Sequence, residues 1–169
     1  MMTNQAILQG NDDASANSVR KTVMVQAPQE IAFRVFTEKL GTWWPLGSHK
    51  IGKTKAVDAV IEPRQGGRWY ERGDDGSTCT WGKVLAWEPH ARLVLTWQVS
   101  ADWQPDPNVL TEVEVHFIAE GADRTRVELE HRNFDAYGAR QAELRAIFES
   151  ENGWKGVLAQ FAERARART

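Results

Sequence analysis

Apolar and polar residues alternate clearly in two stretches of the chain, 111–119 and 124–131. The apolar positions of these stretches are Val113, Val115, Phe117, Val127 and Leu129, and most positions between them hold Glu, Arg or His. A period of two is typical of a strand with one buried and one solvated face. We therefore predict two neighbouring antiparallel strands whose charged faces carry Glu–Arg pairs.

Five further stretches are predicted to be strands, because they are apolar or alternating and are bounded by Gly, Asp or Pro. They cover residues 19–25, 57–62, 67–72, 77–87 and 92–99. Short turns join most of these strands in sequence, which favours an antiparallel meander of seven strands.

Helical periodicity follows the first strand and returns at the end of the chain. Pro28 suits the first turn of a short amphipathic helix that ends near Leu40, and residues 139–149 favour a short helix before the last one. In the last helix, which we expect to end near Arg166, the apolar stripe consists of Trp154, Leu158, Phe161 and Ala165. One helix cannot fill the concave face of seven strands, so we predict an α+β fold with a pocket between sheet and helix.

Length and composition indicate one globular domain. Residues 18–169 form this predicted domain, and the polar segment 1–17 is expected to be a mobile tail. With a net charge of −2 the chain has no electrostatic signature of a nucleic-acid-binding protein. No apolar run approaches the roughly 18 residues of a membrane span. The only cysteine, Cys79, is expected to be a buried small hydrophobe, and a cytoplasmic location with no membrane insertion follows.

Tryptophan is unusually frequent, with eight residues in 169. Tryptophan suits a core and a ligand pocket equally well, so each one has both interpretations. Trp97 and Trp154 are in phase with apolar faces, Trp69 and Trp81 lie on adjacent strands, and Trp43 and Trp44 follow the first helix. With neighbouring apolar residues they form a set of candidate ligand contacts. This set is Trp43, Trp44, Trp69, Trp81, Trp97, Val115, Phe117, Trp154 and Leu158.

Three polar residues are candidates for catalysis. His131 is in phase with the apolar face of its strand and is also a candidate ligand contact, although a satisfied core histidine is the commoner arrangement. Glu151 is in phase with the last helix but equally fits a helix N-terminus. Glu71 enters the cavity if Trp69 faces inward, whereas Arg68 does so if the opposite face of strand 67–72 is inward. The sequence alone does not decide which face of strand 67–72 points inward.

Other titratable residues and motifs add little. His116 is out of phase with its apolar neighbours, and His49 and His90 are predicted to be loop residues. The sequence has no nucleophile elbow, zinc-protease helix, phosphate-binding loop or dinucleotide fingerprint. The histidines and the cysteine lack metal-ligand spacing, so we predict no metal and no cofactor.

Four segments resemble a known family: KTVMVQAPQEIAFRVFTE at 21–38, GGRWYERGDDGSTCTWGKVLAWEPHARLVLTW at 66–97, TRVELEHRNF at 125–134 and GWKGVLAQFAE at 153–163. In this order they resemble the SRPBCC (START-like) superfamily and, within it, the domain related to activators of the heat-shock-protein-90 ATPase. The resemblance implies a helix-grip fold, in which a curved seven-stranded antiparallel sheet surrounds a long C-terminal helix. It also implies a pocket between the sheet and that helix.

Three functions are compatible with this fold, because members of the superfamily differ in activity. The first is binding of a small apolar or aromatic molecule, including a lipid. The second is an enzyme of the polyketide cyclase, dehydratase or hydrolase kind that uses a pocket His or Glu. The third is a domain that binds a protein partner such as a chaperone.

We expect ligand binding without catalysis, by a monomer or a homodimer. The eukaryotic chaperone activators carry an additional N-terminal domain, and only 18 residues precede the first predicted strand. We therefore expect chaperone activation less than ligand binding. The loops 46–55 and 100–109 are candidate gates of the pocket.

Overall fold

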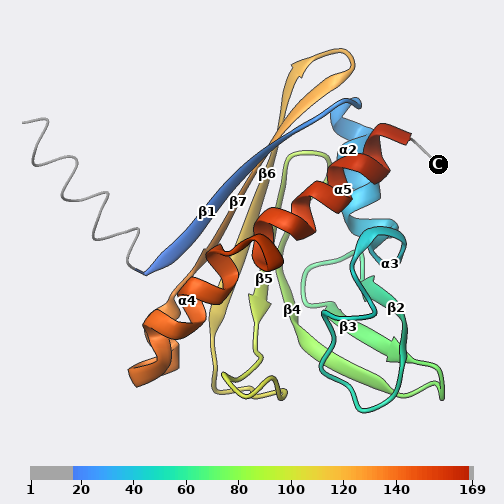
Figure 1. The fold of residues 1–169 in the computed structure, drawn as a ribbon. Coiled ribbons are helices and arrows are strands. Elements are labelled where there is room, and N and C mark those ends of the chain that lie inside the picture. The colour runs from blue at the N-terminus through green and yellow to red at the C-terminus, as the bar shows by residue number, and fades with distance from the viewer. Residues whose placement is uncertain (1–16, 168–169) are drawn as a thin grey trace, which may run out of the picture.

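The computed structural model describes residues 17–167, and its main element is a curled, seven-stranded antiparallel sheet (Figure 1). The strand order across the sheet is β1-β7-β6-β5-β4-β3-β2. The strands are β1 (Ser18–Val25), β2 (Ala56–Ile61), β3 (Arg68–Gly73), β4 (Thr78–Glu88), β5 (Arg92–Trp97), β6 (Thr111–Gly121) and β7 (Arg124–Arg132). All neighbours except β1 and β7 are consecutive in sequence, which is the predicted meander.

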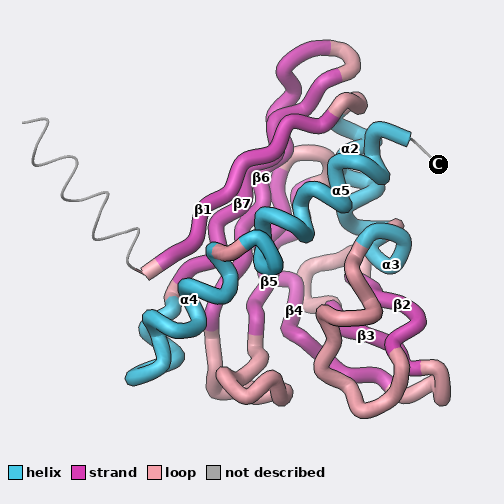
Figure 2. Tube along the Cα trace, viewed as in Figure 1, coloured by secondary structure: helices cyan, strands magenta, loops and turns pink. Residues whose placement is uncertain are grey.

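The helices gather on the concave side of the sheet. They are α2 (Gln29–Glu38), α3 (Leu40–Trp43), the 3-10 helix η1 (Phe134–Arg140), α4 (Gln141–Glu149), the π-helical turn η2 (Glu151–Lys155) and α5 (Gly156–Ala167). Figures 1 and 2 show α4 and α5 crossing the sheet diagonally, with α2 beside the C-terminal part of α5. This arrangement confirms the predicted helix-grip fold, including its short helices after β1 and before the last helix.

The core lies between the concave face and α5. In the register of β6 and β7, Val115 pairs with Leu129 and Phe117 pairs with Val127, and all four side chains are buried. The predicted helix stripe is also buried, as Phe161 shows with no exposed surface. The convex face is charged, and its ion pairs include that of Arg132 Nη2 with Glu112 Oε1 at 2.8 Å.

A glycine causes the kink between α4 and α5. Gly153 has φ −91° and ψ −140°, which is outside the helical region. A Cβ at this position would lie 2.3 Å from the carbonyl oxygen of Phe148, so a larger residue cannot fit without a shift of the backbone. The kink lets Trp154 enter the concave face, where it is buried. This explains the Gly-Trp pair at the start of the last helix.

The structure decides the facing of β3 and changes one strand boundary. Trp69 and Glu71 share the buried face and both contact Trp81, as in the first of the two predicted facings. On the opposite face the exposed Arg68 places its guanidinium 4.3 Å from the centre of the Tyr70 ring. The strand predicted at 92–99 ends at Trp97 and continues only as an isolated bridge between Val99 and Pro105.

Three further sequence predictions concern the ends and surroundings of these elements. Cys79 is half-buried rather than buried, because it lies in β4 close to the strand end. The predicted tail lies outside the described residues apart from Asn17. Within residues 17–167, no helix has the length and apolar character that a membrane crossing requires.

Candidate functional site

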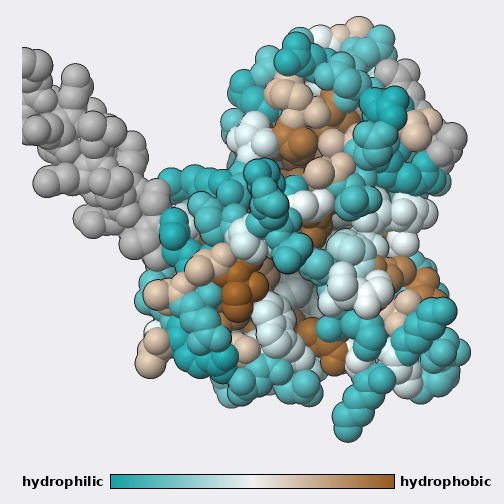
Figure 3. Space-filling view, in the orientation of Figure 1, coloured by the Kyte–Doolittle hydropathy of each residue, from teal (hydrophilic) through white to brown (hydrophobic). Residues whose placement is uncertain are grey.

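A pocket of about 600 Å³ opens between the kinked helix, strands β4 and β5, and two loops. Its aromatic wall consists of Trp44, Trp81, Trp97, Trp103, Phe148 and Trp154. Its polar rim consists of Ser48, His49, Lys50 and Asn152. In the space-filling view the surface is hollowed beside the helices, with apolar side chains visible between polar ones (Figure 3). The volume is in the range of pockets for drug-sized ligands.

The indole rings of the wall pack on one another in fixed orientations. Trp44 lies 4.9 Å from Trp81 between ring centroids, and 5.9 Å from Trp154 in an edge-to-face arrangement. Behind the wall, Trp69 packs edge-on against Trp81 at 5.1 Å, and its Nε1 donates to the carbonyl oxygen of Thr96. Contacts of this kind restrain the rings before any ligand enters.

A buried hydrogen-bond chain holds the back of the pocket. Trp154 Nε1 donates to His131 Nδ1 at 3.0 Å, and His131 Nε2 lies 2.9 Å from Thr111 Oγ1. Thr111 donates its own hydroxyl hydrogen to the carbonyl oxygen of Trp97, so the histidine must donate from Nε2. This chain of hydrogen bonds therefore joins the helix kink to β7, β6 and β5. It also orients two residues of the aromatic wall, Trp97 and Trp154.

His131 is neutral in this environment. Its side chain has no exposed surface, and burial lowers the pKa of His131 from 6.5 to about 3. Both ring nitrogens are occupied by protein partners, and the residue is not among those that line the pocket. It acts here as a positioning residue for Trp154.

Glu71 attaches the loop that carries the polar rim to the sheet. Its carboxylate is 2% exposed and accepts hydrogen bonds from the backbone N–H groups of Ile51 at 2.6 Å and Gly52 at 3.0 Å. A third bond, at 3.0 Å, comes from Trp81 Nε1. Three donors satisfy the buried charge, and the same residue fixes both the loop and an indole of the aromatic wall.

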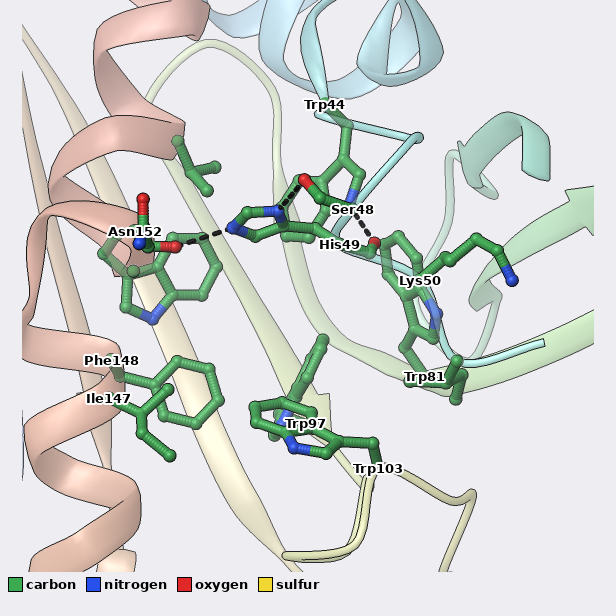
Figure 4. Close-up of a pocket in the computed structure, with 14 residues that line it drawn as sticks. Trp44, Ser48, His49, Lys50, Trp81, Trp97, Trp103, Ile147, Phe148 and Asn152 are labelled. Atoms are coloured by element: carbon green, nitrogen blue, oxygen red, sulfur yellow. Dashed lines mark hydrogen bonds between the residues drawn. The ribbon is translucent and has the colours of Figure 1, made fainter. Parts of the chain in front are cut away.

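The polar rim contains a second hydrogen-bond chain. Figure 4 shows the His49 ring at the rim of the pocket, between Ser48 and the helix kink. Its Nδ1 lies 2.7 Å from Ser48 Oγ, and its Nε2 lies 2.6 Å from the backbone carbonyl oxygen of Asn152. Trp44 Nε1 donates to the carbonyl oxygen of His49 at 2.8 Å. The histidine is therefore held by its ring and by its backbone.

Trp103 forms the opposite side of the entrance. It lies in the loop between β5 and β6, adopts φ 62°, and is 38% exposed. Its ring packs on Phe148 at 5.9 Å, and the adjacent Asp102 pairs with Arg140 at 2.7 Å. An exposed aromatic side chain over a pocket can cover a bound ligand.

The sequence matches one protein family over most of its length. The profile of the family described as "Activator of Hsp90 ATPase homolog 1-like protein" matches residues 26–166. The chain belongs to this family. The match confirms the predicted resemblance to the helix-grip SRPBCC superfamily, and the residues that line the pocket all lie within the matched range.

Two solved structures of this fold are similar to the chain in sequence as well. The anthrahydroquino-gamma-pyrone synthase Txn09, solved in complex with SUM, is 37% identical with a TM-score of 0.62, and the match covers 87% of this chain and 96% of that one. CalC, a self-sacrificing resistance protein from Micromonospora echinospora, is 31% identical with a TM-score of 0.69, covering 90% and 96%.

A third structure shares the fold alone. Protein NE0264 from Nitrosomonas europaea is 16% identical with a TM-score of 0.66, and the match covers 92% of this chain and 97% of that one. Among curated proteins, no sequence matches the chain significantly.

The structure brings together part of the predicted site. Among the predicted ligand contacts, Trp44, Trp81, Trp97 and Trp154 line the pocket. The others are buried in the core without lining it, and they are Trp43, Trp69, Val115, Phe117, His131 and Leu158.

The catalytic candidates do not meet in the pocket. His131 lies behind the aromatic wall and Glu71 beneath the loop that carries the rim. Glu151 is exposed, and its carboxylate lies 3.5 Å from Lys155 Nζ. None of the three is among the residues that line the described pocket.

Residues from the two loops complete the site. Ser48, His49 and Lys50 come from the loop 46–55, and Trp103 comes from the loop 100–109. The sequence marks both loops as candidate gates but gives no periodicity from which the facing of a single residue follows. The Trp-Trp-Pro segment before the first loop is the nearest signal, because Trp44 anchors His49.

Proposed function

We propose that this protein binds a planar, polycyclic aromatic molecule in the pocket beside the kinked helix. The observation that carries the proposal is the aromatic wall, in which five indoles and one phenyl ring surround a space of about 600 Å³. Flat aromatic surfaces pack well against indole faces and edges, and the polar rim supplies a few directional contacts.

The magnitude of burial is sufficient for useful affinity. A ligand that buries roughly 300 Å² of apolar surface gains about 7 kcal/mol at about 25 cal/mol per Å². Burial on the pocket side adds to this gain and the cost of association subtracts several kcal/mol, so we expect a dissociation constant in the micromolar range.

One of the similar proteins supports the same chemical class. The synthase that is 37% identical is named for a fused aromatic pyrone. CalC, at 31% identity, is described as a self-sacrificing resistance protein, a description that names no ligand. A fatty acid or a sterol fits the aromatic wall less well, because neither offers an extended planar ring system.

A ligand titration tests the proposal. The intrinsic tryptophan emission and the melting temperature are followed together while 1,2-dihydroxyanthraquinone, stearic acid or cholesterol is added. We expect saturable quenching and a raised melting temperature with the anthraquinone alone. The variant Trp81→Ala should lose this response, whereas Trp87→Phe, which changes a tryptophan outside the pocket, should keep it. A response to stearic acid but not to the anthraquinone would contradict the proposal.

Ring-closing catalysis is the second candidate function. The observation that favours it is the Ser48–His49 hydrogen bond at the pocket rim, together with the similarity to a pyrone synthase. The test compound is 1-(1-hydroxy-2-naphthyl)butane-1,3-dione, which closes to a fused γ-pyrone with loss of water. We expect the protein to accelerate this reaction, followed by liquid chromatography.

The remaining sequence predictions stay predictions. They are the cytoplasmic location, the monomeric or dimeric state and the possible protein partner. The partner-binding alternative has less support, because Trp103 and Ile147, two of the exposed large apolar side chains, lie at the pocket.

A further inference from the structure

We propose that Ser48 and His49 form the acid–base pair of this pocket and transfer a proton of the bound aromatic molecule during ring closure. The inference rests on the proposed function, because it requires an aromatic ligand in the pocket. Both residues line the pocket, and neither was a catalytic candidate from the sequence.

The hydrogen bonds determine which nitrogen of His49 accepts a proton. A backbone carbonyl can only accept, so the 2.6 Å contact with the Asn152 oxygen requires a hydrogen on Nε2. In the neutral imidazole Nδ1 then has a free lone pair. Ser48 Oγ, at 2.7 Å, donates to this lone pair. A proton that reaches Ser48 Oγ from a ligand can therefore continue to Nδ1.

The helix kink makes this arrangement possible. Asn152 lies in η2, directly before Gly153, whose backbone leaves the helical conformation. The Asn152 carbonyl consequently points to the loop and receives the histidine, as Figure 4 shows. A histidine held in one tautomer by a backbone carbonyl is a common arrangement for a proton-transfer group.

The loop is held on its other side as well. Trp44 Nε1 donates to the His49 carbonyl, and Glu71 accepts the N–H groups of Ile51 and Gly52. The pair therefore sits on a loop with attachments on both sides of it, and these attachments lie in the aromatic wall and the sheet. Pre-organisation of this kind reduces the cost of orienting catalytic groups.

The charged groups near the pair have contacts of their own. Lys50, on the same loop, donates from Nζ to the carbonyl oxygen of Gly52. On the facing element, Glu151 and Lys155 pair with each other. None of the ion pairs found within residues 17–167 includes His49, whose ring partners are Ser48 and Asn152.

The proposed reaction is a cyclodehydration whose atoms balance without an oxidant. In the first step the phenol proton of the ligand passes through Ser48 to His49 Nδ1 while the phenol oxygen bonds to a ketone carbon. The ketone oxygen takes the proton back and becomes a hydroxyl group. In the second step a proton of the neighbouring CH₂ passes to the pair, its electrons form the ring double bond, and the hydroxyl leaves with the returned proton as water.

Two variants and one control test the inference. His49→Gln keeps an N–H donor for the Asn152 carbonyl but cannot accept a ring proton, and Ser48→Ala removes the relay hydroxyl. The control is His116→Gln on the convex face, where His116 pairs with Glu114. For each protein we measure the turnover of 1-(1-hydroxy-2-naphthyl)butane-1,3-dione and the dissociation constant of 1,2-dihydroxyanthraquinone.

We expect His49→Gln to lower turnover by about 100-fold or more, a typical contribution of acid–base catalysis. The dissociation constant of this variant for 1,2-dihydroxyanthraquinone should stay within about threefold of the wild-type value, because the fold and the pocket are preserved. The control His116→Gln should change neither the turnover nor this dissociation constant.

Three results would overturn the inference. Turnover above half of the wild-type value in His49→Gln excludes the pair as the acid–base group. Binding of the anthraquinone without any acceleration by the wild type overturns the inference and leaves the proposed binding function intact. Absence of anthraquinone binding overturns both.

Discussion

Replacing Glu71 with glutamine should destabilise the protein by about 2 to 4 kcal/mol, and the reason lies in its three donors. The best rotamer of the amide keeps its oxygen near Ile51 N and Trp81 Nε1, the two partners of Oε1. The amide nitrogen then faces the N–H of Gly52, the partner of Oε2.

The magnitude follows from these contacts. The two preserved bonds lose their charge assistance, which is worth about 1 kcal/mol each, and the unsatisfied pair of donors costs about 1 to 3 kcal/mol. The relief from burying a carboxylate offsets part of this loss.

Urea unfolding at pH 7, followed by tryptophan emission, measures the effect. The matched control is Glu128→Gln, since Glu128 is 46% exposed on the convex face and lies 3.1 Å from Arg126. An exposed ion pair contributes at most about 1 kcal/mol, so the control should change the free energy of unfolding little. Equal effects of the two substitutions would refute the structural role that we assign to Glu71. Glu71→Gln should also weaken ligand binding, because Glu71 holds the loop that carries the polar rim.

Three further predictions concern the helix kink, the buried histidine and the entrance. Gly153→Ala should cost about 2 to 3 kcal/mol because its Cβ meets the Phe148 carbonyl, whereas Gly47→Ala, with open space around its Cβ, should be nearly neutral in urea unfolding. The pKa of His131 is about 3 in the folded protein, against an ordinary value of 6.5. The neutral buried histidine therefore contributes fully to the free energy of unfolding above about pH 6.5, and this contribution is lost as the pH falls towards 3. Urea unfolding at pH 5 should show a free energy of unfolding about 2 kcal/mol lower than at pH 7.5. Trp103→Ala should raise the dissociation constant of the anthraquinone by about fivefold to tenfold with little effect on the melting temperature.

The fold was predictable because alternation and helical periodicity report burial directly. The phase of 111–119 and 124–131 places Val115 and Phe117 in the core, as the structure does. The same reasoning fails in β4, where Trp81 is an extra residue, a β-bulge, between the partners of Trp69 and Tyr70, so that Trp81 and Gly82 are both buried. A bulge depends on pairing with the neighbouring strand and has no local signature in this segment.

The site was predictable mainly where regular elements form it, with Trp44, directly after α3, as the exception. Trp97 lies on a strand and Trp154 at the start of the last helix, and their phase indicates the pocket. From the sequence, His49 was interpreted as an ordinary loop residue. Its place at the pocket depends on a contact with Asn152, more than 100 residues away in sequence, which the sequence does not reveal. Long-range hydrogen bonds of this kind follow from the folded structure and cannot be deduced from the residues near His49.

The most direct test of the central claim is the indole region of a ¹H–¹⁵N correlation spectrum recorded during addition of 1,2-dihydroxyanthraquinone. The chain has eight tryptophans, so each indole N–H reports on one place in the molecule. We predict that the shifted signals are those of Trp44, Trp81, Trp97, Trp103 and Trp154, which line the pocket. The signals of Trp43, Trp69 and Trp87 should move little. An unchanged spectrum, or shifts concentrated at Trp43 and Trp87, would contradict an aromatic-ligand site in this pocket.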